Sequence, residues 1–310
     1  MTAVKNPIEK KNKKPINWIR VAFILFSILL PWVFFLVFYV YVNIDSIFMA
    51  FQTSDGAWTV DHFVRAFKEF TSPDGELLIA LKNTLITFAI GLVTYPFKVL
   101  VSYFLYKKVP FSGVYRILFF LPAMIFGVAI AMVFTQFVGV YGPIAKQIGE
   151  WMGLSYIPEL LADSRFANYT LWAHMLWLGL PGDLIIWGGT FARIPADVLE
   201  SGQIDGVSWL GEFTKIVVPL VWPTVALQLL LSFCGIFGAS TANFLLTGGA
   251  YGTQTLSTWL YMQTLAGAGD PNAPVFNYMS AVGLIMTVIA VTITMFMRKY
   301  TNKMFTDAEF

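Results

Sequence analysis

The chain has 310 residues, of which 57% are hydrophobic, 17% aromatic and only 12% charged. Soluble domains carry about 25% charged residues, so this composition all but excludes a water-soluble enzyme. The net charge of +2 does not indicate nucleic-acid binding, because the basic residues gather at the chain ends and in short loops. One cysteine, Cys234, and two distant histidines, His62 and His174, offer neither an intramolecular disulfide nor a metal site.

Long stretches without charged residues predict membrane-spanning helices. An ionised side chain near the bilayer centre costs at least about 2.5 kcal/mol. A span needs about 20 apolar residues at a rise of about 1.5 Å each. The first stretch is longer than a signal-peptide core and lacks a small-residue cleavage site, so we expect it to be a retained span. We predict six spans, at residues 19–42, 79–106, 114–138, 168–190, 216–243 and 275–297.

Basic residues predict the orientation of these spans, because Lys and Arg concentrate on the cytoplasmic side of membrane proteins. Both terminal tails are basic, and so is the short loop that contains Lys107, Lys108 and Arg116, whereas the loop after the first span is acidic. We therefore expect an all-α polytopic membrane protein with six transmembrane helices and cytoplasmic N- and C-termini. Its predicted segments are a basic tail at 1–18, a spanning domain at 19–297 with a cytoplasmic loop at 193–215, and a tail at 298–310.

The cytoplasmic loop has the pattern of a helix, a turn and a second helix. Pro195 suits the start of a helix at about Ala196–Ile204, since the first turn needs no backbone N–H from it. Asp205-Gly206 is a turn signal, and Ser208 can cap the next helix. By itself this pattern describes a surface helical hairpin between two spans.

The same loop contains a more specific pattern. Glu200-Ser201-Gly202, followed by Gly206, Ile216 and Pro219, resembles the EAA signature of permease subunits in binding-protein-dependent ABC importers. The family pattern is Glu-Ala-Ala, three residues, Gly, nine residues, Ile, one residue, Leu-Pro, and the spacing is kept here. Ser201-Gly202 replaces the alanine pair and Val218 replaces the leucine, which are small or apolar exchanges.

Three further stretches resemble the carbohydrate branch of this family, which includes the maltose, raffinose and glycerol-phosphate importers. They are Arg116-Ile-Leu-Phe-Phe-Leu-Pro122, Trp177-Leu-Gly-Leu-Pro181 and Leu246-Thr-Gly-Gly249. The resemblance therefore extends over most of the chain. It implies a permease subunit of an ATP-driven sugar importer, with oligosaccharides as the expected substrates, in the bacterial plasma membrane.

The resemblance also implies partners: a second homologous permease, two ATPase subunits and an extracytoplasmic sugar-binding protein. The sequence contains no Gly-Lys pair and hence no P-loop, so we expect ATP and Mg²⁺ to bind to the ATPase subunits, with no cofactor, metal or catalytic site in this chain. An ion-coupled secondary transporter of a small polar solute is the alternative, which predicts more buried charges and internal repeats. A membrane scaffold leaves the loop spacing unexplained.

Two sets of candidate site residues follow from the resemblance. A cytoplasmic coupling helix would contact the ATPase through Glu200, with small residues that allow a close approach. The substrate path would use small, polar and aromatic residues of the fourth and fifth spans, although Ser and Gly in membrane helices also mediate helix packing. The coupling residues are Glu200, Ser201, Gly202, Asp205 and Gly206, and the path residues are Trp177, Leu178, Gly179, Ser232 and Asn243.

Lys98 and Asp183 are charged residues inside the predicted spans. They lie nine and ten residues before Lys107 and Arg193, which at about 1.5 Å per residue places both at a similar depth. We predict that they can pair and that their role is structural or snorkelling, because a single acid in the spans is too few for a proton relay.

Overall fold

The computed structural model describes residues 18–179, 184–238, 241–268 and 274–304, and every regular element in these ranges is a helix apart from one isolated bridge between Gln52 and Trp58. The chain divides into two compact units between Met49 and Ala50. The helical content confirms the predicted all-α class.

The described part of the first unit is one continuous helix made of α1 (Trp18–Phe35), the π-helical segment η1 (Leu36–Tyr41) and α2 (Val42–Ala50), except for Ala50, the last residue of α2, which belongs to the second unit. Residues Phe23–Ala50 are long and apolar enough to cross a membrane. The helix continues beyond the predicted end at residue 42. Polar side chains near that end bond to the preceding turn, as Ser46 Oγ does to the Val42 carbonyl at 2.8 Å, and so do not interrupt the helix.

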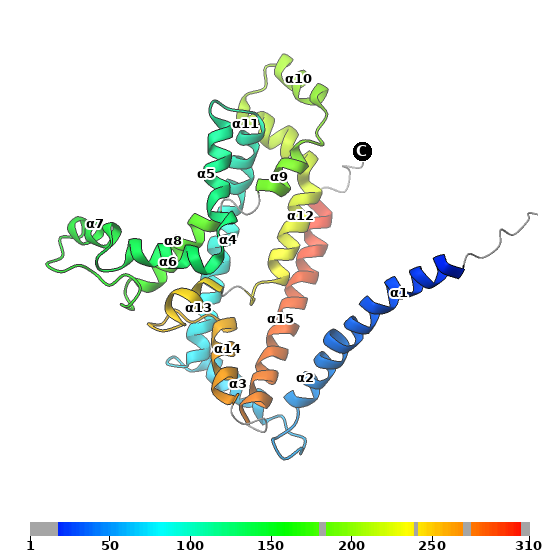
Figure 1. Cartoon of the computed structure of the whole chain (residues 1–310), viewed down its shortest axis with the longest axis vertical. Coiled ribbons are helices and arrows are strands. Elements are labelled where there is room, and N and C mark those ends of the chain that lie inside the picture. Colours follow the sequence, from blue (N-terminus) through cyan, green and yellow to red (C-terminus); the bar gives the residue numbers. More distant parts are fainter. Residues whose placement is uncertain (1–17, 180–183, 239–240, 269–273, 305–310) are drawn as a thin grey trace, which may run out of the picture. The chain divides into compact units, whose positions relative to one another are not determined.

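Three long helices run through the second unit (Figure 1). They are α4 (Glu76–Tyr106), α12 (Val218–Cys234) and α15 (Pro274–Met304); α11 (Trp209–Gly211) and the π-helical segment η2 (Glu212–Val217) lead directly into α12. The helices predicted at 79–106 and 275–297 are therefore confirmed. α12 packs on α15, while α4 packs on α9 (Leu184–Phe191).

The predicted span at 114–138 is wrong as a single straight helix. α5 (Ser112–Met124) and α6 (Gly127–Val138) meet at an angle of 97°, which makes this segment a broken span or a re-entrant loop. The backbone becomes extended at Ile125, a few residues after Pro122, whose missing N–H weakens the helix there. The Arg116 guanidinium donates to the Leu105 carbonyl at 2.7 Å and attaches α5 to the end of α4.

The fourth and fifth predicted spans also differ in their bounds. The region 168–190 contains α8 (Ala167–Gly179) and α9, with undescribed residues between them. The predicted helix at 216–243 begins earlier, at Trp209, and ends at Cys234, because the backbone turns at Gly235 before α13 (Thr241–Thr247). Within the described ranges, four helices are long and apolar enough to cross a membrane, or five if the bent pair counts as one, against six predicted.

The two ends of the second unit differ in the elements that they carry (Figure 1). One end carries α10 (Ala196–Ile204), the basic C-terminal ends of α4 and α15, and α5; Trp222 Nε1 donates to the Thr301 carbonyl at 3.4 Å and holds α12 to α15 there. The opposite end carries α3 (Asp61–Thr71) and α14 (Leu256–Gly267), where Trp259 Nε1 donates to Glu76 Oε2 at 3.2 Å. α7 (Pro143–Trp151) follows α6.

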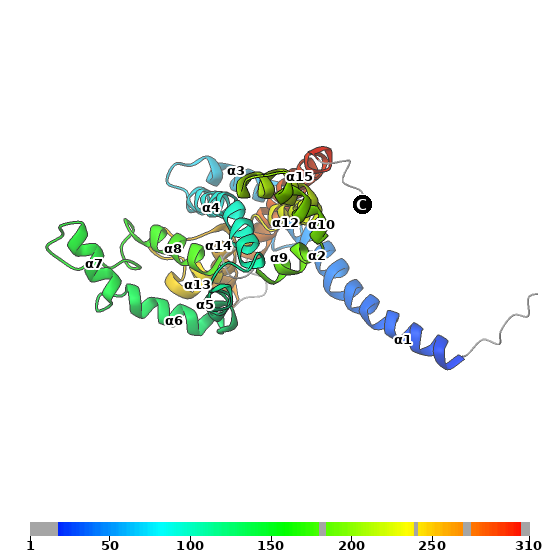
Figure 2. The same cartoon turned by 90° about the horizontal axis from the view of Figure 1, so that it is seen from above.

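A buried core lies beneath α10, where α4, α9 and α12 meet, and Figure 2 shows α10 from above over this region. Trp187 and Phe191 of α9 are fully buried there, and Leu199 inserts from α10. Large aromatic side chains bury the most apolar surface per residue, so this cluster holds α10 firmly on the bundle. Its buried members are Tyr95, Val99, Tyr103, Trp187, Phe191, Ile194, Leu199, Val217, Val221 and Val225.

Candidate functional site

The helical hairpin around α10 has the local structure that the sequence predicts. Pro195 precedes the first helical residue in an extended conformation, and α10 ends at Ile204. Gly206 has φ +70°, a left-handed conformation that favours glycine, and the Ser208 hydroxyl accepts the Gly211 N–H at 3.3 Å. These local signals confirm the predicted bounds of the short helix.

The two faces of α10 have different surroundings. On the inner face, Gly202 is buried, and a Cβ at this position would lie 2.7 Å from Ile216 Cδ1. On the outer face, the remaining predicted coupling residues are exposed: Glu200, Ser201, Asp205 and Gly206. Gly202 therefore lets α10 pack closely against Ile216, whereas the acidic Glu200 and Asp205 are exposed and face outward.

Exposed apolar side chains accompany these acids, and the sequence analysis missed them. Ile204 at the end of α10 is 86% exposed, and Trp209 just beyond the turn is 57% exposed. Leu210 is exposed beside them. Trp209 and Leu210 stand at the start of the apolar stretch Trp209–Cys234, whereas Ile204 is the last residue of α10. Exposed apolar side chains of this kind suit contact with a partner protein or with a membrane. The Trp209-Leu210 pair, in a loop that is otherwise mostly polar, is the sequence feature from which these exposed side chains could have been predicted.

Filling the space at Gly202 should force the Ile216 side chain to move. The variant Gly202→Ala places a methyl group 2.7 Å from Ile216 Cδ1, the end of a flexible side chain that can shift, so this overpacking should cost about 1 kcal/mol, at the low end of the usual range. Ile216→Val removes Cδ1 itself, so the double variant should recover most of the lost stability. Thermal unfolding of the purified protein in detergent measures this. Additive losses in the double variant would show that the two residues do not limit the approach of α10.

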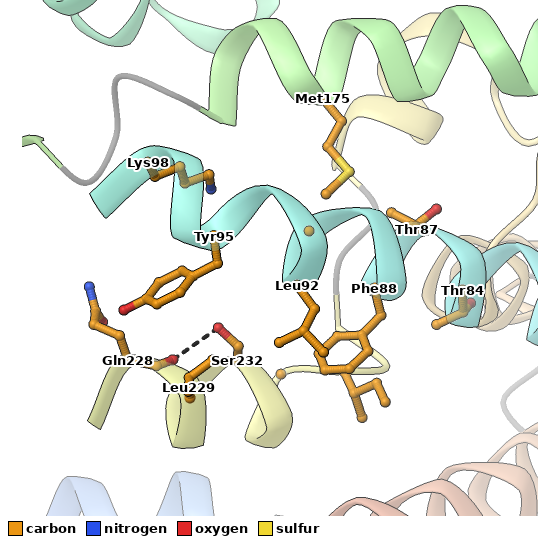
Figure 3. Close-up of a pocket in the computed structure, with 13 residues that line it drawn as sticks. Thr84, Thr87, Phe88, Leu92, Tyr95, Lys98, Met175, Gln228, Leu229 and Ser232 are labelled. Atoms are coloured by element: carbon orange, nitrogen blue, oxygen red, sulfur yellow. Dashed lines mark hydrogen bonds between the residues drawn. The ribbon is translucent and has the colours of Figure 1, made fainter. Parts of the chain in front are cut away.

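A cavity of about 300 Å³ lies between α4, α8 and α12 (Figure 3). On α4 its walls run from Thr84 to Lys98, so it lies around the middle of that helix rather than at either end. The lining residues are Thr84, Thr87, Phe88, Gly91, Leu92, Tyr95, Lys98, Met175, Gln228, Leu229, Ser232, Gly235 and Ile236.

The cavity wall combines hydroxyl, amide and aromatic groups. The Tyr95 side chain points from α4 toward Gln228 and Ser232 on α12 (Figure 3). The Ser232 hydroxyl donates to the Gln228 backbone carbonyl at 2.9 Å and keeps oxygen lone pairs for a ligand. Sugar hydroxyls need such donors and acceptors, and their C–H faces pack on aromatic rings, so the cavity can hold a polar, hydroxylated solute.

The predicted path residues are not all in this cavity. Ser232 lines it, and Gly179 lies behind its wall, where a Cβ would be 3.4 Å from Lys98 Nζ. Trp177 instead stacks on Phe134 with ring centroids 6.0 Å apart. Asn243 donates to the Thr253 carbonyl at 2.8 Å and so holds a loop.

Other predictions concern residues away from the cavity lining. Leu178 is half-buried and is not among the lining residues. The predicted pairing of Lys98 with Asp183 lies outside the described residues, because Asp183 is not described. In the described ranges, no group of three or more His, Cys, Asp or Glu side chains gathers as a metal site would require.

The sequence analysis missed the α4 side of the cavity. Thr84, Thr87 and Tyr95 interrupt the apolar character of α4 only slightly, and threonine hydroxyls in helices commonly bond to their own backbone. Thr84 does so, donating to the Ala80 carbonyl at 2.7 Å. No pattern in the sequence distinguished these residues from packing residues, because their importance depends on which helix faces them.

The homologues of this chain are permease subunits of sugar ABC transporters, and its fold is that of an ABC importer permease. This confirms the resemblance predicted from the sequence. No family model matches the chain. The multiple sugar-binding transport system permease protein MsmF of Streptococcus mutans is 22% identical over 232 residues, covering 74% of this chain and 78% of that protein.

Two further matches extend the comparison. The osmoprotective compounds uptake permease protein GgtC of Synechocystis is 26% identical over 238 residues, covering 73% of this chain and 81% of that protein. A crystal structure of a bacterial alginate ABC transporter, in complex with an alginate pentasaccharide-bound periplasmic protein, contains a chain that matches with a TM-score of 0.76 and 23% identity. That match covers 92% of this chain and 96% of the other, and it shows the fold.

Proposed function

We propose that this chain is the membrane-spanning permease subunit of an ATP-driven oligosaccharide importer, that it forms half of the translocation path, and that it receives the ATPase stroke through α10. The observation that carries the proposal is the position of α10. Its outer face is exposed and acidic, while its inner face packs on the core formed by α4, α9 and α12. A rigid helix so placed can carry a displacement from a partner to the cavity walls.

The need for partner subunits follows from the absence of an ATP-binding motif in the sequence. Without a P-loop, it would depend on two ATPase subunits that bind ATP and Mg²⁺. A second homologous permease would complete the path, and an extracytoplasmic binding protein would deliver the sugar. The transporter's homologues support this assembly.

The orientation follows from charge. The end that carries α10 also carries Lys107 and Lys108, as well as the basic C-terminal part of α15. Basic residues concentrate on the cytoplasmic side, so this end would face the cytoplasm and the end with α3 and α14 would face outward. The chain would accordingly be a multi-pass protein of the bacterial inner membrane, with six spans and with both termini in the cytoplasm.

The substrate class is supported by the chemistry of the cavity. Hydroxyl and amide groups from Thr87, Gln228 and Ser232 suit sugar hydroxyls, and Phe88 and Tyr95 offer aromatic faces. A relative named for the transport of multiple sugars fits a polar, hydroxylated solute. The choice among sugars would be made first by the binding protein.

An ion-coupled carrier of a small polar solute is the second candidate, favoured by the presence of the ionisable Lys98 in the cavity wall. The homology to ABC permeases weighs against it. The two functions differ in their energy source, which can be measured directly.

The test begins with purification of the tagged chain from its native membrane and identification of co-purifying proteins. The complex is then reconstituted with its binding protein and a panel of mono- and oligosaccharides. We expect ATPase subunits to co-purify and ATP hydrolysis to rise with one class of oligosaccharide. Uptake that follows an ion gradient without ATP would contradict the proposal and support the carrier.

A further inference from the structure

A buried carboxylate lies directly beneath α10. Glu212, the first residue of η2, is 2% exposed. Its Oε1 accepts a hydrogen bond from the Tyr103 hydroxyl, and Lys107 Nζ lies 2.6 Å from Oε1 and 2.7 Å from Oε2. Both partners come from the C-terminal end of α4, Tyr103 from its last turn and Lys107 from the residue that caps it, more than a hundred residues away in the sequence.

The geometry of this cluster is set by packing. Tyr103 is 1% exposed, with its ring centroid 5.5 Å from that of Phe191 and 5.3 Å from that of Phe213. Lys107 Nζ also lies 5.6 Å from the centre of the Tyr103 ring. A buried charge is costly unless it is paired and hydrogen-bonded, so Glu212 is stable only where both partners meet it.

The cluster joins three elements. The Gln203 side chain of α10 also interacts with the Glu212 carboxylate, and α10 rests closely on η2 at Gly202. Through η2, Glu212 is continuous with α12, whereas Tyr103 belongs to α4 and Lys107 is the C-cap of that helix. α4 and α12 are also the helices whose side chains face each other across the cavity.

The backbone at this point is unusual as well. η2 is a π-helical segment of 6 residues that begins at Glu212. π-helical turns are rare and occur frequently at functional sites, because they are maintained only where the surrounding contacts require them. Here the turn lies between the cytoplasmic hairpin and the helix that lines the cavity.

We propose that Glu212 is a positioning residue for transport: held by Tyr103 and Lys107, it ties α10 to α4, so that movement of α10 shifts α4 and α12 together. This inference rests on the proposed function of α10. Apolar contacts in the core beneath α10 permit small sliding movements, whereas the buried Glu212 carboxylate is held at both oxygens by the partly exposed Lys107 ammonium and at one of them by the Tyr103 hydroxyl, which restricts its geometry. The pair therefore transmits a displacement that the apolar core alone would absorb.

The test uses the assembled transporter with its ATPase subunits and binding protein. Lys107→Met should lower the amount of sugar taken up per ATP hydrolysed by about tenfold, which is within the usual range of coupling effects. The rate of ATP hydrolysis and the association of the ATPase subunits should stay close to those of the unaltered complex. Lys107→Arg keeps the charge and should retain the ratio. Lys108→Met is the matched control, because Lys108 is the neighbouring exposed lysine at the same helix end, whereas the contacts with Glu212 are made by Lys107.

Two further variants protect the test against misfolding. Tyr103→Phe removes only the hydroxyl, and Glu212→Gln combined with Lys107→Met removes both charges without leaving either one unpaired. We expect both to assemble and to show the same lowered uptake per ATP. If the assembled variants take up a normal amount of sugar per ATP hydrolysed, or if none of them assembles, Glu212 has a purely structural role and the inference is wrong. If the proposed function itself is wrong, the unaltered complex will lack ATP-dependent uptake, so this outcome can be told apart from a failure of the inference about Glu212.

Discussion

Ser232→Phe should reduce sugar uptake by more than about tenfold while the complex still assembles. Ser232 lines a cavity of about 300 Å³, and a phenyl ring there fills space that a sugar ring would need. It also replaces a hydroxyl at a position where a polar solute would be bound, and a single unpaired polar group costs about 1–3 kcal/mol. Uptake of labelled oligosaccharide into proteoliposomes measures the loss.

The matched control is Leu231→Phe, which adds an aromatic ring at the adjacent residue of α12. Leu231 is exposed and is not among the residues that line the cavity, so its uptake should stay near the unaltered level. ATPase stimulation by the loaded binding protein should partly survive in Ser232→Phe, because α10 is untouched. Normal uptake by this variant would place the path elsewhere in the bundle.

Reversing the charge of the outer face of α10 should abolish uptake and release the ATPase subunits. Glu200 and Asp205 are both exposed there, next to the exposed Ile204. The variant Glu200→Lys with Asp205→Lys replaces acids that a partner surface would meet, and mispaired charges at an interface cost several kcal/mol. We expect the affinity for the ATPase subunits to fall by at least about tenfold. Co-purification at increasing salt measures it.

Lys299→Glu is a suitable control for this variant, because it also reverses the charge of an exposed side chain, on α15 and outside α10. The helical content of the double-lysine variant should be unchanged, since both altered side chains are exposed and Leu199 still anchors α10 in the core. A normally assembled, transporting double-lysine variant would exclude α10 as the docking helix.

The sequence determined the features that depend on a few neighbouring residues. The helix of α10 begins and ends where predicted because Pro195, Gly206 and Ser208 each act on the backbone within one turn. The long helices α4 and α15 were equally predictable, since uninterrupted apolar length is itself the signal for a span. The spacing of the loop after Glu200 also identified the homologous transporters.

The tertiary structure alone decided which of these residues face one another. The bend between α5 and α6 and the end of α12 at Cys234 lie inside apolar stretches, and the sequence did not distinguish Pro122, near the bend, from Pro96 and Pro223, which lie inside continuous helices. Nothing in the sequence singles out Glu212, because its partners Tyr103 and Lys107 are remote in sequence and meet it only when the end of α4 reaches η2. Gly202 and Glu200 lie on the same short helix. Gly202 is a packing residue because it faces Ile216, whereas Glu200 is exposed.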